Sequence, residues 1–148
     1  TEMVTGIDIV KEQIRISSGE PLGYTQADVQ MKGTSIECRI NAEDPANNFK
    51  PSPGLITKFQ VPGGFGVRVD THAYQGYKVP SFYDSMIAKL VVHQRDRSEA
   101  IACMRRALDE FIIEGISTNI PLAKEIFRHF HFLRGKVNTG FIEEYFTG

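Results

Sequence analysis

The chain has 148 residues and a formal net charge of −1, with 41% hydrophobic and 24% charged residues. These proportions are those of an ordinary globular protein of one domain. The near-neutral charge argues against a nucleic-acid partner, because binding to phosphates needs a basic surplus. No apolar run approaches the roughly 20 residues that span a bilayer, so no membrane association is expected.

The two cysteines indicate a cellular compartment, and the first residues indicate whether the sequence is part of a longer polypeptide. Cys38 falls in a strand pattern and Cys103 in a helical one, so we expect two reduced core residues rather than a disulfide, and an intracellular protein. The opening residues, Thr1-Glu2-Met3, are neither an initiator methionine nor a signal peptide. We therefore expect a piece of a longer polypeptide that is cytoplasmic, with an organelle stroma or matrix as the alternative.

The first predicted element is a helix over residues 7–18. Thr5 is a suitable N-cap, and Asp8 three residues later suits a capping box. Gly19 fits the position just after the helix, where a left-handed conformation is common. The expected buried stripe consists of Ile7, Val10 and Ile14.

Residues 36–41 predict a half-buried strand, because apolar and polar side chains alternate with a period of two. The polar face carries an arginine between a carboxylate and an amide. From this pattern alone, a strand arginine is more often an ordinary ion-pair partner than a functional residue. The apolar face is Ile36, Cys38 and Ile40, and the polar face is Glu37, Arg39 and Asn41.

Two further strands are predicted over residues 55–61 and 67–70, joined by a glycine-rich turn at 62–66. We expect them to form a hairpin. The turn lacks the Gly-Lys-Ser/Thr sequence of a phosphate-binding Walker loop, and a strand follows it where a dinucleotide-binding loop would need a helix. A structural turn is therefore the better interpretation.

The second half of the chain alternates strand and helix. A strand is predicted over residues 87–93, and Asp96 then caps a helix with apolar residues at steps of three and four. A short strand over 111–113, a helix capped by Asn119 and a last helix over 139–145 follow. Antiparallel strands with helices packed at one side define the α+β class.

The histidines and the aromatic cluster give no catalytic or metal-binding pattern. His129 and His131 are two residues apart, which places them on different faces of a helix. His72 and His93 have no acidic or thiol partner nearby in sequence, so surface or capping roles are expected and no metal site is predicted. Core packing or an interface explains the aromatic residues as well as a pocket does: Tyr74, Tyr77, Phe82 and Tyr83.

Several motifs occur in one order along the chain. Residues 37–45 read Glu-Cys-Arg-Ile-Asn-Ala-Glu-Asp-Pro, and residues 83–90 read Tyr-Asp-Ser-Met-Ile-Ala-Lys-Leu. Together with segments 1–8, 51–54, 62–68 and 115–119, they resemble the C-terminal domain of biotin carboxylases, members of the ATP-grasp superfamily. The first motif is most similar to the biotin carboxylase subunit of acetyl-CoA carboxylase. The same domain of a propionyl-, methylcrotonyl- or pyruvate-carboxylase is the alternative.

The resemblance implies the reaction of a parent enzyme. ATP, assisted by Mg²⁺, phosphorylates bicarbonate, and the resulting carboxyphosphate delivers CO₂ to N1′ of biotin on a biotin carboxyl carrier protein. The implied parent is a homodimer that works with a carboxyltransferase. The family's nucleotide- and metal-binding segments match nothing in this chain. We therefore expect residues 1–148 to form one C-terminal domain that binds no cofactor and is inactive alone.

The resemblance also assigns residues. Arg39 matches the catalytic arginine, which stabilises the deprotonated ureido oxygen of biotin and lies against the bicarbonate site. A guanidinium suits this task because it stays charged and presents a rigid fork of donors. From their shared face, Glu37 and Asn41 are expected to hold the Arg39 rotamer.

The resemblance implies binding or interface roles for three further residues. Asp84 is expected beside the biotin pocket, with capping of a turn as the equal alternative. Phe65 and Arg68 match positions at the dimer interface of the family. A reading from another class remains open, namely a non-catalytic module that mediates dimerisation or docks the carrier protein.

Overall fold

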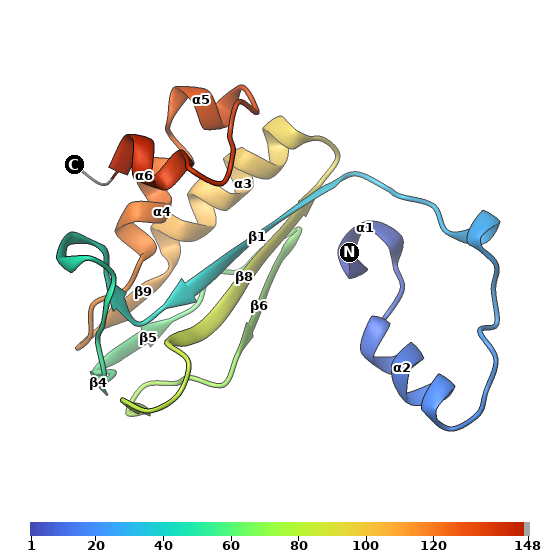
Figure 1. Cartoon of the computed structure of the whole chain (residues 1–148), viewed down its shortest axis with the longest axis horizontal. Coiled ribbons are helices and arrows are strands. Elements are labelled where there is room, and N and C mark those ends of the chain that lie inside the picture. Colours follow the sequence, from blue (N-terminus) through green and yellow to red (C-terminus); the bar gives the residue numbers. More distant parts are fainter. Residues whose placement is uncertain (147–148) are drawn as a thin grey trace.

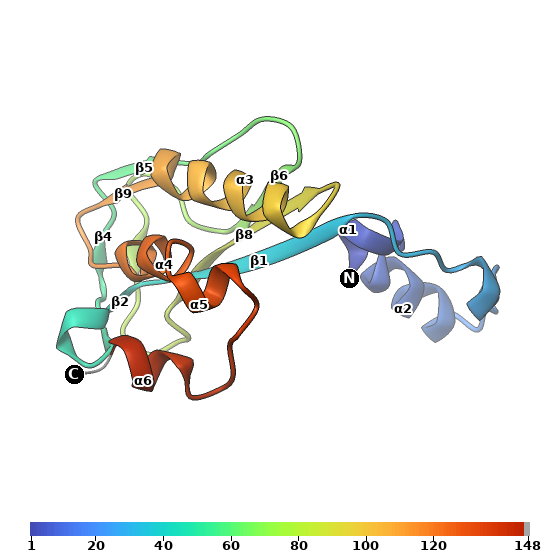
Figure 2. The same cartoon turned by 90° about the horizontal axis from the view of Figure 1, so that it is seen from above.

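The computed structural model describes residues 1–146. Its main sheet has three antiparallel strands in the order β1-β8-β6, so the two outer strands both pair with β8. Helices cover one face of this sheet (Figures 1 and 2). The predicted α+β class is confirmed. The three strands are β1 (Thr34–Asn41), β6 (Val67–Thr71) and β8 (Met86–Gln94).

The core lies between the main sheet and helix α3 (Arg97–Glu110). Ile40 of β1 and Leu90 of β8 are fully buried, as are Met104 and Leu108 of α3. The predicted cap is confirmed, because the Asp96 carboxylate accepts a hydrogen bond from the Glu99 N–H at 2.9 Å. Alternation in β1 therefore places its apolar side chains against α3 and its polar side chains on the opposite face.

Three short helices complete the layer over the sheet: α4 (Ile120–Ile126), α5 (Phe130–Leu133) and α6 (Phe141–Phe146). His129 is the N-cap residue of α5, and its ring packs against Phe141 and Tyr145 with centroid distances of 5.2 and 4.7 Å. This histidine therefore packs in an aromatic cluster at the start of α5, and its side chain makes no capping hydrogen bond.

The predicted hairpin of residues 55–61 and 67–70 is wrong. Strand β5 (Lys58–Gln60) pairs with β9 (Ile112–Glu114), whereas β6 pairs with β8. Phe59 lies opposite Ile113 in this pairing, and its ring packs edge-on against Phe111 at 5.8 Å. The apolar side chain of β5 is thus covered by residues distant in sequence. The glycine-rich segment connects two different sheets.

Two-residue strands tie down the loops around the sheet. β2 (Glu43–Asp44) pairs with β3 (Lys50–Pro51), and β4 (Gly54–Leu55) pairs with β7 (Lys78–Val79). Single 3₁₀ turns occur at Gln26–Asp28 and Pro45–Asn47.

The first 33 residues form an arm that extends to one side of the sheet (Figure 1). It contains α1 (Glu2–Thr5) and α2 (Ile9–Ser17), and the N-cap of α2 is Asp8 rather than Thr5. The expected buried stripe is wrong, because the side chains of Val10 and Ile14 are 60% and 63% exposed. The helix is amphipathic as predicted, but no residue of α2 is buried by the described chain.

Candidate functional site

The face of the main sheet opposite α3 carries charged side chains in rows that run across the strands. Directly paired residues of antiparallel strands point to the same face, so the register defines these rows. Each row takes one residue from β1, one from β8 and one from β6. The rows are Arg39–Lys89–Asp70 and Glu37–Val91–Arg68.

The guanidinium of Arg39 is available to a ligand. Its side chain is 69% exposed, and its Nε lies 3.5 Å from Oε1 of Glu37. Such an exposed pair contributes at most about 1 kcal/mol, so it orients the guanidinium at little cost to ligand binding. Within residues 1–146, no hydrogen bond engages the two terminal nitrogens of Arg39.

The two expected helpers of Arg39 differ in what they do. Glu37 contacts the guanidinium, as expected from their shared face. Asn41 instead donates from Nδ2 to the Glu43 carboxylate at 3.3 Å. The register with β8 shifts between Ile40 and Asn41, which separates Asn41 from the regular alternation of the strand.

The main chain at Arg39 is fixed by Asn119. Nδ2 of Asn119 donates to the Arg39 carbonyl at 2.9 Å, and Oδ1 accepts from the Asn41 N–H at 2.9 Å. The backbone N–H of Asn119 also donates to the Asn41 carbonyl, at 3.2 Å. The sequence predicts Asn119 as a helix cap, but its side chain makes no capping bond to α4. Its position in the motif 115–119 was the only signal of another role.

Glu43 joins the motifs of residues 37–45 and 83–90. Its Oε1 accepts hydrogen bonds from the Ser85 hydroxyl and from Asn41 Nδ2. The Ala42 N–H donates to the Ser85 carbonyl at 2.8 Å, so the segment before β8 is fastened to the end of β1. The sequence places Glu43 in the motif of residues 37–45 but predicts no role for it.

Asp84 lies next to Ser85 and is exposed. Its Oδ1 accepts a hydrogen bond from the Met86 N–H at 2.9 Å, which is the turn-capping contact expected as the alternative. This contact holds the turn that leads into β8. A place for Asp84 beside biotin stays a prediction.

Phe65 and Arg68 lie toward the other end of the sheet. The Phe65 side chain is 88% exposed in the segment between β5 and β6. The guanidinium of Arg68 pairs within the chain, with Asp70 at 2.9 Å and with Glu2 of α1 at 3.3 Å. Arg68 thus fastens the arm to the sheet, and its role at a dimer interface stays a prediction.

Cys38 is on the core-facing side of β1, beside Arg39 in sequence. Burial, reinforced by the nearby carboxylate of Glu37, raises the pKa of the Cys38 thiol to about 11. The thiol therefore stays protonated at neutral pH and is a poor nucleophile. Both cysteines are free, as expected.

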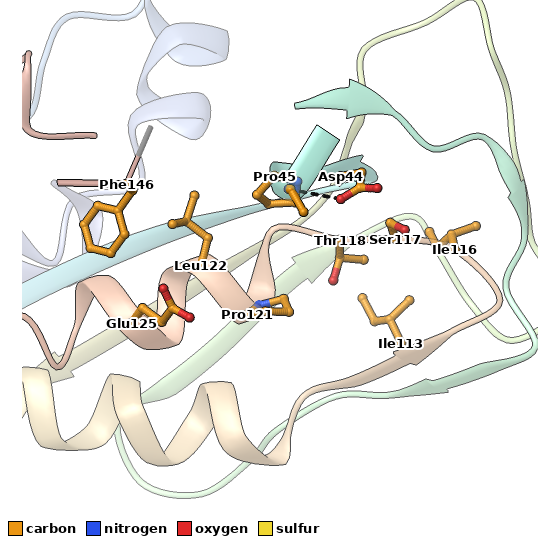
Figure 3. A pocket seen from close by; sticks show the side chains of 11 residues that line it. Asp44, Pro45, Ile113, Ile116, Ser117, Thr118, Pro121, Leu122, Glu125 and Phe146 are labelled. Carbon is orange, nitrogen blue, oxygen red and sulfur yellow. Dashed lines mark hydrogen bonds between the residues drawn. The ribbon is translucent and has the colours of Figure 1, made fainter. Parts of the chain in front are cut away.

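A pocket of about 500 Å³ lies apart from these residues, between the turn after β2, the start of α4 and the end of α6 (Figure 3). Its walls combine apolar side chains such as Ile113 and Leu122 with the carboxylates of Asp44 and Glu125. None of the four site residues predicted from the sequence lines this pocket. The charged sheet face, not this pocket, contains the candidate chemistry.

The described residues contain no group of three or more His, Cys, Asp or Glu side chains that could hold a metal ion. None of their helices is long and apolar enough to cross a membrane.

The chain matches known proteins over nearly its whole length. The family model of the biotin carboxylase C-terminal domain matches residues 37–144. Biotin carboxylase of Allochromatium vinosum is 58% identical over 97% of this chain, which covers 32% of that protein. A pyruvate carboxylase subunit of Methanothermobacter thermautotrophicus is 55% identical over 100% of this chain, which covers 30% of that protein.

The solved structures agree. The biotin carboxylase domain dimer of Hydrogenobacter thermophilus 2-oxoglutarate carboxylase, in complex with MgADP, ADP and bicarbonate, matches with a TM-score of 0.96 and 49% identity. The match covers 97% of this chain and 32% of that chain. This chain therefore spans about a third of the length of these relatives. It belongs to the biotin carboxylases and contains their C-terminal domain.

Proposed function

We propose that residues 1–148 are the C-terminal domain of an ATP-dependent biotin carboxylase, in which Arg39 stabilises the ureido oxygen of carrier-bound biotin during carboxyl transfer. The observation that carries the proposal is the state of Arg39. Its guanidinium is exposed on a strand whose main chain is clamped by Asn119, and only Glu37 pairs with it within residues 1–146. The charge is thus fixed in place and still available.

The chemistry needs such a cation. The ureido nitrogen is a poor nucleophile until it loses its proton, and negative charge then develops on the ureido oxygen. As N1′ attacks, a C–N bond forms to the carboxyl carbon and the bond from that carbon to the phosphate oxygen breaks. A donor held in place before the reaction stabilises the developing charge without reorganising. A strand in a packed sheet provides that rigidity.

The proposed parent is the biotin carboxylase subunit of acetyl-CoA carboxylase, acting in the cytoplasm in the first half-reaction of fatty acid biosynthesis. Its partners would be a biotin carboxyl carrier protein and a carboxyltransferase, with ATP and Mg²⁺ bound outside this chain. The same domain of a pyruvate or 2-oxoglutarate carboxylase is the alternative, since relatives with both names match this chain. Biotin is the acceptor in every case, so the role of Arg39 does not depend on this choice.

We also propose that the parent is a homodimer with Phe65 and Arg68 at its interface. A large aromatic side chain that is 88% exposed on a connecting segment is characteristic of an interface anchor. The Hydrogenobacter relative is described as a dimer, which supports a homodimeric parent.

The proposal is tested with Arg39→Ala in the full-length parent, using free biotin, bicarbonate and ATP. Biotin carboxylation should slow by roughly 10²–10³-fold, the scale for losing one positioned oxyanion donor, while ATP affinity stays the same. Arg105→Ala is the matched control, because Arg105 is an exposed arginine on α3, distant from this face.

Two results would contradict the proposal. If nucleotide binding collapsed while carboxyl transfer per bound ATP stayed normal, Arg39 would have another role. If carboxylation were unaffected by Arg39→Ala, the domain would be better explained as a dimerisation or carrier-docking module.

A further inference from the structure

Two aromatic side chains stand exposed next to each other in the loop before β8. Phe82 is 78% exposed and Tyr83 is 79% exposed, and their ring centroids lie 5.2 Å apart. Neither residue has a part in the reaction proposed above. Apolar surface that is left in contact with water over neighbouring side chains marks a site of interaction.

A third exposed ring belongs to the same area. Tyr77 and Tyr83 line one hollow of about 260 Å³, and Tyr74, which is 61% exposed, packs against Tyr77 with a centroid distance of 5.6 Å. We name Tyr74, Phe82 and Tyr83 the aromatic patch. Aromatic side chains from two separate loops thus gather at one place, and such residues are enriched at the centres of protein interfaces.

Hydrogen bonds fix the main chain of both loops. The Asp84 carboxylate accepts from the Met86 N–H at 2.9 Å, and the Tyr77 carbonyl accepts from the Ile56 N–H at 2.9 Å. A loop that is already ordered loses little conformational freedom when a partner binds to it, so less of the binding energy is lost. The aromatic patch is therefore preorganised for contact.

The aromatic patch lies at the end of the main sheet that bears Arg39. Met86, which follows the loop of the patch, is the first residue of β8, and Lys89 of the same strand pairs with Arg39. A second hollow, of about 290 Å³, is lined by Lys89, His72 and Met86, and the last two also line the hollow beside Tyr83. The patch and the row of Arg39 therefore adjoin along one stretch of surface.

Phe65, which we propose for the dimer interface, lies at the other end of β8. Its carbonyl accepts from Nε2 of Gln94, the last residue of β8, at 3.2 Å. The aromatic patch instead precedes the first residue of that strand, at the end of the sheet away from the arm (Figure 1). β8 has nine residues, so roughly 27 Å separates its two ends. The two surfaces can therefore serve different partners.

We propose that the aromatic patch docks the biotin-bearing domain of the carrier protein, through apolar side chains of that domain next to its biotin. This inference rests on the proposed function. Carrier-bound biotin is tethered, so the carrier has to sit within reach of Arg39 while the ureido group is carboxylated. The patch meets that condition, because it is exposed, rich in aromatic side chains and adjoins the row of Arg39. A second copy of this chain is instead expected at Phe65.

The test compares two acceptors in the full-length parent, the biotinylated carrier protein and free biotin. Phe82→Ala and Tyr83→Ala should each raise KM for the carrier roughly tenfold or more, the scale for one interface anchor, because each removes a ring from the docking surface. The KM for free biotin should stay the same, since free biotin brings no carrier surface. Tyr83→Phe keeps the ring and should keep the affinity for the carrier.

Phe130→Ala is the matched control, because Phe130 is an aromatic residue of α5 with 56% exposure, in the helical layer that covers the other face of the sheet. It should leave both acceptors unaffected. Because Phe82 and Tyr83 are exposed, their variants should melt at the wild-type temperature.

An unchanged KM for the carrier in both alanine variants would overturn the docking surface, even if Arg39→Ala slowed carboxylation as expected. An equal rise in the KM for free biotin would overturn it as well, because biotin itself would then lie on these rings. Dissociation of the dimer in sedimentation would assign the aromatic patch to a second copy of the chain and reject the carrier. A normal rate in Arg39→Ala would instead reject the proposed function itself.

Discussion

Asn119 and Arg39 are joined by a hydrogen bond from the side-chain amide of the first to the main-chain carbonyl of the second, at 2.9 Å. β1 is an edge strand, so its outer peptide groups have no partner strand. The carboxamide of Asn119 offers both a donor and an acceptor to that edge and takes the place of a further strand across Arg39 and Asn41. It does so where the pairing with β8 becomes irregular.

Replacing Asn119 with leucine should therefore destabilise the domain. The substitution keeps the size of the side chain but leaves the Arg39 carbonyl and the Asn41 N–H without partners. The Asn41 N–H is part-buried, and leaving it unsatisfied costs about 1–3 kcal/mol, so the free energy of unfolding should fall by about that much in a urea titration. Carboxylation by the full-length parent should also slow, because the strand that holds Arg39 is less fixed.

Asn47→Leu is the control for this change, because Asn47 lies in an exposed turn and should tolerate the same substitution. Equal losses of stability in the two variants would show that the bridge to β1 contributes nothing.

Gly66 should not tolerate a side chain. Its φ is +71°, and a Cβ there would lie 2.3 Å from the backbone carbonyl oxygen of His93, which cannot move aside. Gly66→Ala should lower the free energy of unfolding by about 1–3 kcal/mol, the usual range for a strained backbone position. Gly63→Ala in the same segment is the comparison, because a Cβ at Gly63 meets nothing within 4 Å. Urea titrations that gave the same loss for both glycines would contradict the steric argument.

Phe65 allows the interface to be tested without disturbing the fold. Because its side chain is 88% exposed, Phe65→Ala should leave the free energy of unfolding within about 0.5 kcal/mol of the wild type. In the full-length parent, sedimentation should show dimer dissociation at roughly tenfold higher concentration, the scale for one interface anchor. Phe82→Ala is matched in exposure, at 78%, and should leave the dimer intact.

Arg68→Glu should weaken the dimer as well, but it also brings three carboxylates together with Asp70 and Glu2. A dimer that survives Phe65→Ala and Arg68→Glu unchanged would place the interface elsewhere.

The raised pKa of the Cys38 thiol predicts a loss of stability at alkaline pH. Its thiol has a pKa of about 11 in the folded chain instead of its ordinary value of 9.0, so the unfolded chain gives up this proton first as pH rises. Deprotonation then favours unfolding, and stability should decrease between about pH 9 and 11 by at most about 1.4 kcal/mol per pH unit. Urea titrations under reducing conditions measure this slope. Cys38→Ala should flatten it, and an equally steep slope in that variant would assign the effect to other groups.

The spacing of apolar residues along the sequence predicted individual strands and helices correctly. The alternation around Arg39 identified β1, and the spacing after Asp96 identified α3. The partner of β5 was not predictable in this way, because an apolar residue such as Phe59 fits any apolar neighbour equally well. In the structure Phe59 packs against Phe111 and lies opposite Ile113, and β5 does not pair with β6, the strand that follows it in sequence.

The candidate site shows the same division. The period of two predicted that Glu37 and Arg39 share one face of the strand. The role of Arg39 came from the resemblance to the family. Lys89 is a neighbour of Arg39 because of the strand register, and the bridge from Asn119 is a contact between residues 80 positions apart, so the sequence of one strand contains neither. The predicted burial of α2 is wrong because amphipathicity shows that a helix has an apolar side. It does not show whether the rest of the described chain covers that side.

The strand register also has a consequence for how the domain folds. Thr34 pairs with Gln94 and Asn41 with Met86, so β1 cannot form its ladder until β8, which lies far along the chain, is available. Such non-local pairings make folding slow, whereas β8 and α3 are adjacent in sequence and can associate early. The row of Arg39, Lys89 and Asp70 draws one residue from each strand. A nascent chain therefore exposes Arg39 early, but this row is complete only when β8 has been synthesised and both outer strands have joined it.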